Sequence, residues 1–452
     1  MTFWTAARVA DALATVGGRE GGGPGDGFSA VSTDTRALRG GELFVALKGE
    51  RFDAHDFLAD AKARGAAAAV VRRGTQRVDG LPFFEVDDTL AALGLLARAR
   101  RRLLPAGSPV VAVTGSSGKT STKEMIRAAL ATRWPVHATA GNLNNLIGVP
   151  LTILGAADDA GALVVEAGAS VPGEIPLLAG IIEPTVAVVT NVGYAHMEGF
   201  GSLDGVLREK VAIAAGVRVA VVGTEPPALA VEARRRARTV VAGSGPAADV
   251  RPDAAELDEE GRPRITWQGR TVTLPVEGFH HIENAMIALA AAREAGADPP
   301  AALEALRQVR LPAGRGAVRE AGGLTLIDDT YNANPSSLRW AVRFAHWLAA
   351  RRGRPLAVVV GSMLELGAES ERLHQEAARE IAALKPSLVA AVGAFAPAFE
   401  TVRGALAPGR LVTAPDAVAL GPALRAALGG DEVVLLKASR GVALERVLRF
   451  LN

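Results

Sequence analysis

The most constraining feature of the sequence is a short apolar segment that runs into a glycine-containing loop and then into a helical segment. Residues Pro109–Val113 are apolar, as expected of a strand that is buried on both faces of a sheet. The loop Thr114-Gly-Ser-Ser-Gly-Lys-Thr-Ser121 follows directly, and the next residues, KEMIRAALA, have helical periodicity. A strand, loop and helix in this order belong to a parallel sheet covered by helices, so the segment predicts an α/β fold.

Short apolar runs alternate with helical segments along the rest of the chain, beginning with a run at Ala67–Val71. This alternation predicts parallel sheets throughout. Strands are expected at Ala162–Val165, Thr185–Thr190, Val217–Val222, Leu324–Ile327, Leu356–Val360, Leu388–Val392 and Glu432–Leu436, with a more exposed β segment at Ile265–Val276. Helices are expected at Asn284–Ala295, Ser337–Ala350, Ser370–Ala383 and Ala417–Leu428.

Two clusters of helix- and strand-breaking residues divide the chain. They are Pro105-Ala-Gly-Ser-Pro109 and Arg310-Leu-Pro-Ala-Gly-Arg-Gly316. A chain of 452 residues is too long for one ordinary domain of roughly 100–200 residues. We therefore expect an N-terminal domain at residues 1–107, a central domain at residues 108–312 and a C-terminal domain at residues 313–452, all of them α/β.

The glycine loop has the composition of a phosphate-binding loop. Gly115 and Gly118 permit unusual backbone dihedrals that bring N–H groups toward phosphate oxygens, Lys119 adds a positive charge and Thr120 offers a hydroxyl to Mg²⁺. The strict G-x-x-x-x-G-K-[ST] pattern is not met, because Val113 occupies its first glycine position. A Gly/Ser turn with a surface lysine is the alternative, but the flanking strand and helix favour ATP binding. The expected ATP-binding residues are Thr114, Gly115, Ser116, Ser117, Gly118, Lys119, Thr120 and Ser121.

Other polar residues follow the predicted strands directly. Glu166 follows one strand, and His196 and Glu198 follow the next. Because ligands of doubly wound sheets lie beyond the carboxyl ends of the strands, these side chains are candidates for Mg²⁺ sites beside a nucleotide. Lys210 lies on a predicted helix and, judged alone, has the pattern of a solvated surface lysine.

Composition narrows the class of protein. The absence of cysteine excludes disulfides, thiolate metal sites and a cysteine nucleophile. A net charge of +2 and an aromatic content of 4% give little basis for binding nucleic acid, so none is expected as a partner. Asp11 interrupts the apolar N-terminal segment, and no run reaches the roughly 18 apolar residues of a membrane helix. We expect a cytoplasmic protein that is not inserted in a membrane.

The chain resembles the Mur ligase family, because a series of motifs occurs in family order. The motifs span nearly the whole chain. They are Ser32-Thr-Asp-Thr-Arg36, Leu43-Phe-Val-Ala-Leu-Lys-Gly49, the phosphate loop, Gly141-Asn-Leu-Asn-Asn-Leu-Ile-Gly-Val-Pro150, Ala195-His-Met-Glu-Gly-Phe-Gly-Ser202, Asp328-Asp-Thr-Tyr-Asn-Ala-Asn-Pro335 and Leu364-Glu-Leu-Gly367. Two of them, N-L-N-N-L-I-G-V-P and D-D-T-Y-N-A-N-P, are similar to those of the dipeptide-adding members, and a D-N-P-R motif of the amino-acid-adding members is not found.

The resemblance implies an N-terminal uridine-nucleotide domain, a central P-loop ATPase domain and a C-terminal Rossmann-like domain. It also implies a ligase of peptidoglycan synthesis. The expected cofactors are ATP and Mg²⁺, and the expected substrates are UDP-N-acetylmuramoyl-tripeptide and D-alanyl-D-alanine. The expected reaction joins the two substrates through an acyl-phosphate. A monomer is expected.

The resemblance also implies roles for individual residues. Lys119 would hold the transferred phosphate, Thr120 and Glu166 would position Mg²⁺, His196 would serve a second Mg²⁺, and Lys210 matches the lysine that the family carbamylates. Expected nucleotide contacts are Asn284, Arg315, Asp329 and Tyr331, and expected substrate contacts are Ser32, Asp34, Thr35, Arg36, Lys48, Asn142, Asn144, Asn145, Asn332 and Asn334. His281 departs from the family pattern, in which Asn is usual at this position, as do Ser362, Ala438 and Tyr194 at theirs.

Four other functions were compared with the dipeptide-adding ligase. Another Mur-type ligase would add a single amino acid. Folylpolyglutamate synthase shares the ATPase core but lacks the N-terminal uridine domain, and a domain-sized segment precedes the loop here. A P-loop motor or regulatory ATPase would hydrolyse nucleotide without an acceptor. A catalytically idle binding module would have lost Lys119, Glu166 or His196, and all three are present.

Overall fold

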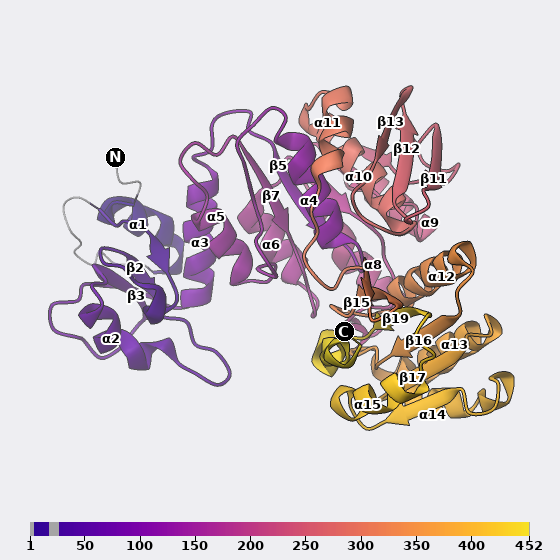
Figure 1. Ribbon diagram of the computed structural model, residues 1–452. Helices are drawn as coiled ribbons and strands as arrows, with labels where there is room; N and C mark the ends of the chain where they lie inside the picture. The colour runs from indigo at the N-terminus through magenta and orange to yellow at the C-terminus, as the bar shows by residue number, and fades with distance from the viewer. Residues whose placement is uncertain (1–3, 18–26, 452) are drawn as a thin grey trace. The chain divides into compact units, whose positions relative to one another are not determined.

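The computed structural model describes residues 4–17 and 27–451, which form two compact units. The first unit contains Met1–Ala112, Trp134–Gly168 and Glu174–Pro184, and the second contains Val113–Arg133, Ala169–Gly173 and Thr185–Asn452. The ribbon in Figure 1 is coloured by residue number, so the segments of each unit can be located in it. Within the described ranges, no helix combines the length and the apolarity needed to cross a membrane.

The first unit begins with a four-stranded parallel sheet in the order β1-β2-β3-β4. Successive residues of its strands enter two different cores: Leu43 and Val45 pack in one and Phe44 in the other. The sheet is therefore buried on both faces, as parallel sheets require. Its elements are β1 (Val31–Ser32), β2 (Leu43–Val45), β3 (Ala68–Arg72), β4 (Phe83–Val86), α1 (Ala6–Leu13), α2 (Leu58–Ala63) and α3 (Thr89–Arg101).

The remainder of the first unit packs against α3. The parallel strands β6 (Val136–Ala138) and β7 (Ala162–Glu166) belong to it, and α3 contacts both α5 (Gly148–Leu154) and α6 (Glu174–Ile182). An ion cluster fixes the end of α6: Glu183 accepts hydrogen bonds from Arg98 and Arg102, and Arg101 donates to the Glu183 carbonyl.

The second unit contains the glycine loop and the helices around it. Strand β5 (Val110–Thr114) ends in this unit, where Thr190 N–H donates to the Thr114 carbonyl at 2.9 Å. Helix α4 (Lys119–Leu130) packs along α10 (His280–Ala295), as Figure 1 shows. The other elements are the parallel strands β8 (Val186–Val189), β9 (Val219–Val222) and β10 (Thr239–Val241), the antiparallel strands β11 (Ala254–Leu257), β12 (Pro263–Trp267) and β13 (Arg270–Thr273), and α7 (Met197–Phe200), α8 (Leu203–Val211), α9 (Pro227–Arg234) and α11 (Pro299–Ala305).

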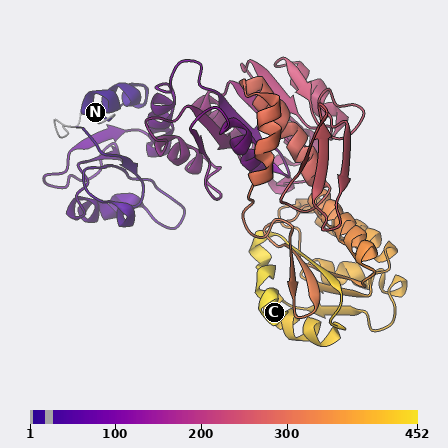
Figure 2. The same ribbon diagram turned by 45° about the horizontal axis from the view of Figure 1, so that its top comes forward.

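The C-terminal part of the second unit is a six-stranded sheet in the order β14-β15-β19-β16-β17-β18, seen from another side in Figure 2. Only β14 is antiparallel. The last strand lies between β15 and β16, which places Lys437 in register with Asp329. The elements are β14 (Ala317–Ala321), β15 (Leu324–Asp329), β16 (Leu356–Val360), β17 (Leu388–Val392), β18 (Leu411–Ala414), β19 (Val433–Lys437), α12 (Pro335–Arg352), α13 (Ser370–Ala383), α14 (Phe395–Glu400) and α15 (Ala417–Ala427).

Most predicted segments agree closely with the structure. The helix expected at Ser370–Ala383 has the same ends as α13, and the helix expected from Asn284 begins earlier, at His280. The exposed β segment expected at Ile265–Val276 is a hairpin, and its inward-facing Ile265 and Val272 are buried. One face of the hairpin packs against the rest of its unit, which explains why these two side chains are buried. The mixture of polar and apolar residues in the segment does not show which side chains will be covered.

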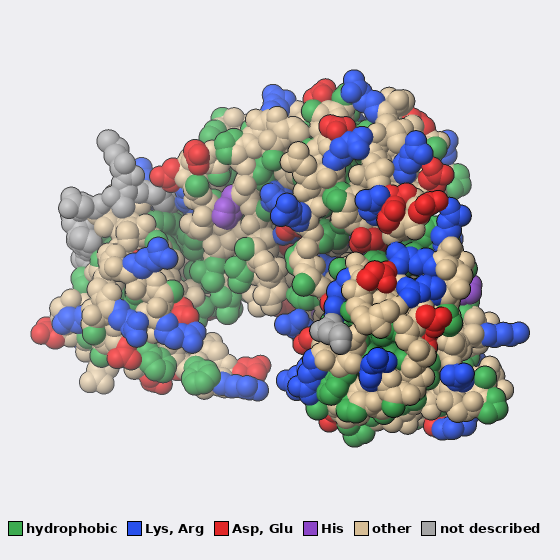
Figure 3. Space-filling model, in the orientation of Figure 1, with side chains coloured by type: hydrophobic (Ala, Val, Ile, Leu, Met, Phe, Trp, Pro, Cys, Tyr) green, Lys and Arg blue, Asp and Glu red, His purple; other side chains and the backbone are tan. Residues whose placement is uncertain are grey.

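Basic and acidic side chains are interspersed on the face that Figure 3 draws. Many of them pair locally, as Arg339 does with Glu380 and Arg372 with Glu369. Exposed pairs of this kind contribute little to stability and mainly keep the surface polar.

Candidate nucleotide-binding site

The glycine loop has a backbone that only glycine adopts readily. Gly115 has φ = +145° and Gly118, the residue before α4, has φ = +77°. A Cβ on Gly115 would lie 2.0 Å from Thr190 Oγ1. The loop therefore needs glycine both for its dihedrals and for close packing against the segment that follows β8.

Residues 190–193 hold the loop in shape. Thr190 Oγ1 donates to the Ser117 carbonyl at 2.6 Å, and Ser117 N–H donates to Asn191 Oδ1 at 3.0 Å. Ser116 Oγ donates to the Gly193 carbonyl at 3.0 Å. Sequence reasoning did not single out Thr190 or Asn191, although their position at the end of a predicted strand was a usable signal.

Lys119 and Thr120 open α4 as the motif predicts. The Lys119 ammonium donates to the Gly115 carbonyl at 2.7 Å, and the Thr120 side chain is buried in the first turn. Ser116, Ser117, Gly118 and Lys119 are all partly accessible to solvent. The loop can therefore receive a phosphate, and the N-terminal end of α4 supplies N–H donors and a favourable dipole for it.

Helix α10 brings Asn284 and His281 to the back of the loop. Asn284 Oδ1 accepts a hydrogen bond from Thr122 Oγ1 at 3.3 Å, and a Cβ on Gly118 would lie 2.6 Å from that same oxygen. Burial lowers the pKa of His281 well below its ordinary value, so the imidazole is neutral at pH 7. Its Nδ1 lies 3.4 Å from Asn284 Nδ2.

Asp329 and Lys437 form a buried pair at the carboxyl ends of β15 and β19. Burial raises the pKa of Asp329 despite the opposing effect of Lys437. Lys437 Nζ donates to Asp329 Oδ2 at 2.5 Å and to the Asn332 carbonyl at 3.0 Å. The strand ends thus hold the start of the segment that leads into α12.

Tyr331 is flanked by two arginines. The guanidinium carbon of Arg315 lies 4.1 Å from the centre of the Tyr331 ring, and that of Arg440 lies 5.5 Å from it. Arg315 Nε is buried and has no hydrogen-bond partner. Of the residues predicted to contact nucleotide, Arg315 and Tyr331 are therefore brought together, whereas Arg440 was not predicted.

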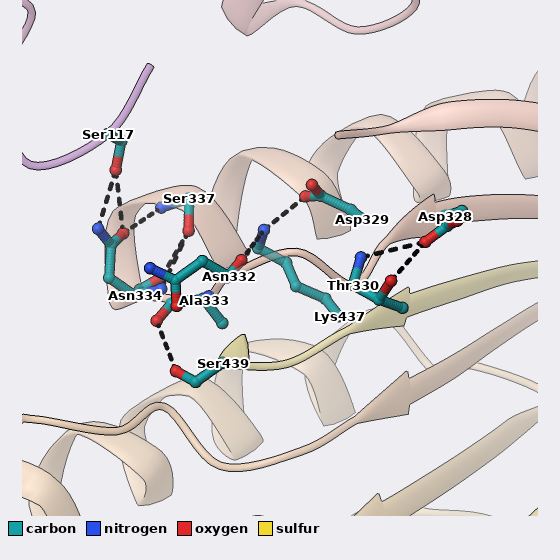
Figure 4. Close-up of polar contacts among 10 residues, drawn as sticks. All are labelled: Ser117, Asp328, Asp329, Thr330, Asn332, Ala333, Asn334, Ser337, Lys437 and Ser439. Carbon is teal, nitrogen blue, oxygen red and sulfur yellow. Dashed lines mark hydrogen bonds and ion pairs between the residues drawn. The ribbon is translucent and has the colours of Figure 1, made fainter. Parts of the chain in front are cut away.

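Asn334 connects α12 to the glycine loop, as Figure 4 shows. Its Nδ2 donates to the Ser116 carbonyl at 3.2 Å and to Ser117 Oγ at 2.9 Å. Its Oδ1 accepts from Ser337 N–H at 2.8 Å and so caps the helix. Asn334 was expected to contact substrate, and in the structure its side chain lies on the phosphate loop.

His196 and Lys210 contact consecutive residues of one segment. His196 Nδ1 lies 3.4 Å from Ser170 Oγ and 2.6 Å from Glu365 Oε2, while Lys210 Nζ donates to the Ala169 carbonyl at 3.2 Å. The hydrogen bond from His196 lowers the pKa of Glu365. Lys210 is 1% exposed, so the solvated surface lysine that its sequence pattern suggests is wrong.

In the first unit, Glu166 lies at the end of β7 and is 2% exposed. Asn144 Nδ2 donates to Glu166 Oε1 at 2.8 Å, and the Asn144 carbonyl accepts from Gly168 N–H. Asn145 Oδ1 accepts from Gly148 N–H at the start of α5, and the Asn142 carbonyl accepts from Asn144 N–H. The predicted residues Asn144 and Glu166 therefore meet directly.

The predicted uridine segment is also in the first unit. Arg36 forms a two-point ion pair with Asp34, and this hydrogen bonding lowers the pKa of the Asp34 carboxyl. Ser32 Oγ donates to the Asp34 carbonyl, and Thr35 begins a short 3₁₀ turn. Lys48 lies 3.7 Å from Asp53 and is mostly exposed.

The donor set available for a metal is mixed. In residues 4–17 and 27–451, no three His, Asp or Glu side chains are grouped so as to hold a metal ion by themselves. Thr120 and Glu166 are nevertheless buried oxygen donors of the type that Mg²⁺ prefers. Because Mg²⁺ usually keeps waters and takes phosphate oxygens, each of these two side chains, taken by itself, has the chemistry of a partial Mg²⁺ ligand.

A strand, a glycine loop and a helix that begins with lysine define the class of α/β proteins that bind nucleotide phosphates. Three family models match the chain in order: the Mur ligase family catalytic domain at residues 28–101, the Mur ligase middle domain at 113–292 and the Mur ligase glutamate ligase domain at 314–440. The chain belongs to the Mur ligase family.

Several relatives match nearly full length. The UDP-N-acetylmuramoyl-tripeptide–D-alanyl-D-alanine ligase of Escherichia coli (strain K12) is 39% identical over 94% of this chain and 94% of its own. MurF from Acinetobacter baumannii superposes with a TM-score of 0.87 at 32% identity, covering 99% of this chain and 98% of that one. MurF from Thermotoga maritima, solved in complex with ADP, has a TM-score of 0.80 at 30% identity and covers 93% and 96%.

Proposed function

We propose that this protein joins D-alanyl-D-alanine to UDP-N-acetylmuramoyl-tripeptide and converts ATP to ADP and phosphate. Near full-length similarity to enzymes named for that reaction carries the proposal. The phosphate loop, with its two glycines at positive φ and Lys119 at the start of α4, supplies the nucleotide site. The protein is an ATP-dependent, ADP-forming ligase of peptidoglycan synthesis.

The reaction proceeds in two steps, formation of an acyl-phosphate and its aminolysis. A carboxylate oxygen of the tripeptide forms a bond to the γ-phosphorus of ATP, and the bond to the β,γ-bridging oxygen breaks to release ADP. The dipeptide amine then attacks the carbonyl carbon, loses its proton and expels phosphate. No side-chain nucleophile is needed, because positioning and charge stabilisation lower both barriers.

The nucleotide side of the site is proposed to follow the loop. Lys119 would move from the Gly115 carbonyl, 2.7 Å away, to the terminal phosphates. Its ammonium would there offset the charge that develops on the transferred group. The full proposed set is Thr114, Gly115, Ser116, Ser117, Gly118, Lys119, Thr120, Ser121, Asn284, Arg315, Asp329 and Tyr331.

Mg²⁺ is proposed as the second cofactor, held by Thr120, Glu166, His196 and a carbamylated Lys210. The ion would supply Lewis-acid stabilisation of the phosphoryl oxygens. Carbamylation would join the neutral Lys210 amine to the carbon of CO₂ with loss of one proton, giving a carboxylate-like ligand. Activity that does not change when bicarbonate is restored to CO₂-depleted enzyme would argue against the carbamate.

A further set of residues is proposed to contact the substrates. Its residues would be Ser32, Asp34, Thr35, Arg36, Lys48, Asn142, Asn144, Asn145, Asn332 and Asn334. The domains are proposed to be residues 1–107 for the uridine nucleotide, 108–312 for ATP and 313–452 for ligation, and each family match falls inside one of them. We further propose a cytoplasmic monomer with no nucleic-acid partner.

A phosphate-release assay tests the proposed reaction. Release should require ATP, UDP-N-acetylmuramoyl-tripeptide and D-alanyl-D-alanine together, and the Lys119→Ala variant should lose it. Release that occurs with a single amino acid in place of the dipeptide would indicate an amino-acid-adding ligase. Release with folate and glutamate, or with no acceptor at all, would contradict the proposal.

A further inference from the structure

The Asn334 side chain makes two sets of hydrogen bonds at once. Towards its own helix, Oδ1 accepts from Ser337 N–H at 2.8 Å, and Ser337 Oγ accepts from Asn334 N–H at 3.0 Å. This is a capping box at the start of the 18-residue helix α12. Towards the phosphate loop, Nδ2 donates to the Ser116 carbonyl at 3.2 Å and to Ser117 Oγ at 2.9 Å. A residue that only capped α12 would not need the hydrogen bonds to Ser116 and Ser117.

Lys437, the last residue of β19, and Ser439, which follows the strand, hold the segment that carries Asn334. Lys437 Nζ, which is almost fully buried, donates to the Asn332 carbonyl at 3.0 Å. Ser439 Oγ donates to the Ala333 carbonyl at 3.2 Å and accepts from Leu364 N–H at 2.9 Å. Figure 4 shows the contact of Lys437 with Asn332 and that of Ser439 with Ala333. Asn334 is therefore presented by a fixed backbone.

The loop that Asn334 touches is fixed from the opposite side. Thr190 and Asn191 bind the carbonyl and the N–H of Ser117, so its backbone cannot move toward Asn334 without breaking those hydrogen bonds. Gly118, the next residue, precedes α4, and Asn334 precedes α12. The positive ends of two helices therefore meet at Ser117, where both can act on a bound phosphate.

We propose that Asn334 is a positioning residue which aligns the N-terminal end of α12 on the ATP-bound phosphate loop, with Lys437 and Ser439 holding it in place. The proposal rests on the proposed function only in taking ATP as the nucleotide. Losing the link removes one to two hydrogen bonds from the loop and lets the second helix end move away from the phosphates. The loss should weaken ATP affinity about fivefold to tenfold.

Two substitutions separate the link from the helix cap. Aspartate and serine both cap helices well, so Asn334→Asp and Asn334→Ser keep the bond to Ser337 N–H. Aspartate keeps an acceptor for Ser117 Oγ but has no donor for the Ser116 carbonyl, whereas serine is too short to reach either group. We expect both variants to keep the wild-type thermal midpoint and to bind ATP about fivefold to tenfold more weakly.

Asp416→Ala is the matched control, because Asp416 caps α15 through Val418 N–H and Ala419 N–H. It should lower the thermal midpoint and leave ATP affinity unchanged. Wild-type ATP affinity in both Asn334→Asp and Asn334→Ser would overturn the proposal.

A double-mutant cycle gives a test that does not depend on stability. Ser117→Ala removes the hydroxyl that Asn334 contacts, so Ser117→Ala and Asn334→Ser should be strongly non-additive in their effect on ATP affinity. Additive effects would overturn the proposal. Affinity is measured by calorimetry with ATP and Mg²⁺ and no acceptor, so these results stand even if phosphate release shows a different acceptor.

Discussion

Gly118→Ala tests whether the loop depends on glycine for its dihedrals or also for its packing. Gly118 has φ = +77°, and a Cβ there would lie 2.6 Å from Asn284 Oδ1. Gly216 has nearly the same dihedral, φ = +74°, but a Cβ there would have no neighbour within 4 Å. The two alanine variants therefore share the backbone strain and differ in the contact with Asn284.

The magnitude follows from these contacts. Alanine in the left-handed region costs about 1–2 kcal/mol at either position. At residue 118, Asn284 must also turn away, which breaks its hydrogen bond with Thr122 Oγ1 and leaves two buried polar groups unpaired. That loss adds about 1–3 kcal/mol. Gly118→Ala should therefore lower the free energy of unfolding by about 2–5 kcal/mol and Gly216→Ala by about 1–2 kcal/mol.

Thermal unfolding and ATP titration together check this prediction. At roughly 2–4 °C per kcal/mol, the thermal midpoint of Gly118→Ala should fall several degrees below that of Gly216→Ala. ATP affinity should fall only in Gly118→Ala, because only there does the change reach the phosphate loop. Equal midpoints and equal ATP affinities in the two variants would refute the argument from packing.

Two further predictions concern pH. Hydrogen bonds from Arg102 and Arg98 lower the pKa of Glu183 to about 2 from 4.5, so its contribution is complete above pH 4.5 and is lost as the pH falls toward 2. We expect Glu183→Gln to remove about 1–2 kcal/mol of that acid dependence. The thermal midpoint of the variant should therefore change less between pH 5 and pH 3 than that of the wild type, and an equal change in both proteins would contradict the prediction. Burial lowers the pKa of His281, so below about pH 6.5 this imidazole binds a proton in the unfolded chain but stays neutral in the folded chain. The free energy of unfolding of the wild type should therefore decline from pH 7 to pH 5. His281→Asn should reduce that decline, and parallel curves would show that another group is responsible.

Much of the fold followed from local pattern. The ends of α13 and the strands at Leu356–Val360 and Leu388–Val392 were predicted as the structure has them, because buried parallel strands are apolar throughout and are bounded by breakers. The short strands β6, β10 and β18 were not predicted. Each has only three or four residues, and the pairing that makes it a strand comes from a neighbour elsewhere in the chain.

Several site residues could not be found from local pattern. Lys437 has the sequence of an ordinary strand end, yet it is 2% exposed because β19 inserts between β15 and β16 opposite Asp329. Arg440, which follows β19, reaches Tyr331 in the same way, through the position of its strand. Resemblance to the family placed Lys210 in the site, although spacing alone suggested a surface residue.

The sequence by itself determined the phosphate loop, because its needs are local: glycines for positive φ, a lysine at the helix start and an apolar strand before it. Tertiary structure alone decided what holds and completes that loop. Asn334 lies 217 residues from Ser117 along the chain, and only the packing of two strand-and-helix layers brings them within hydrogen-bonding distance. Dihedral preferences depend on residues that are adjacent in the sequence, whereas hydrogen-bond partners and burial depend on how distant segments of the chain pack together.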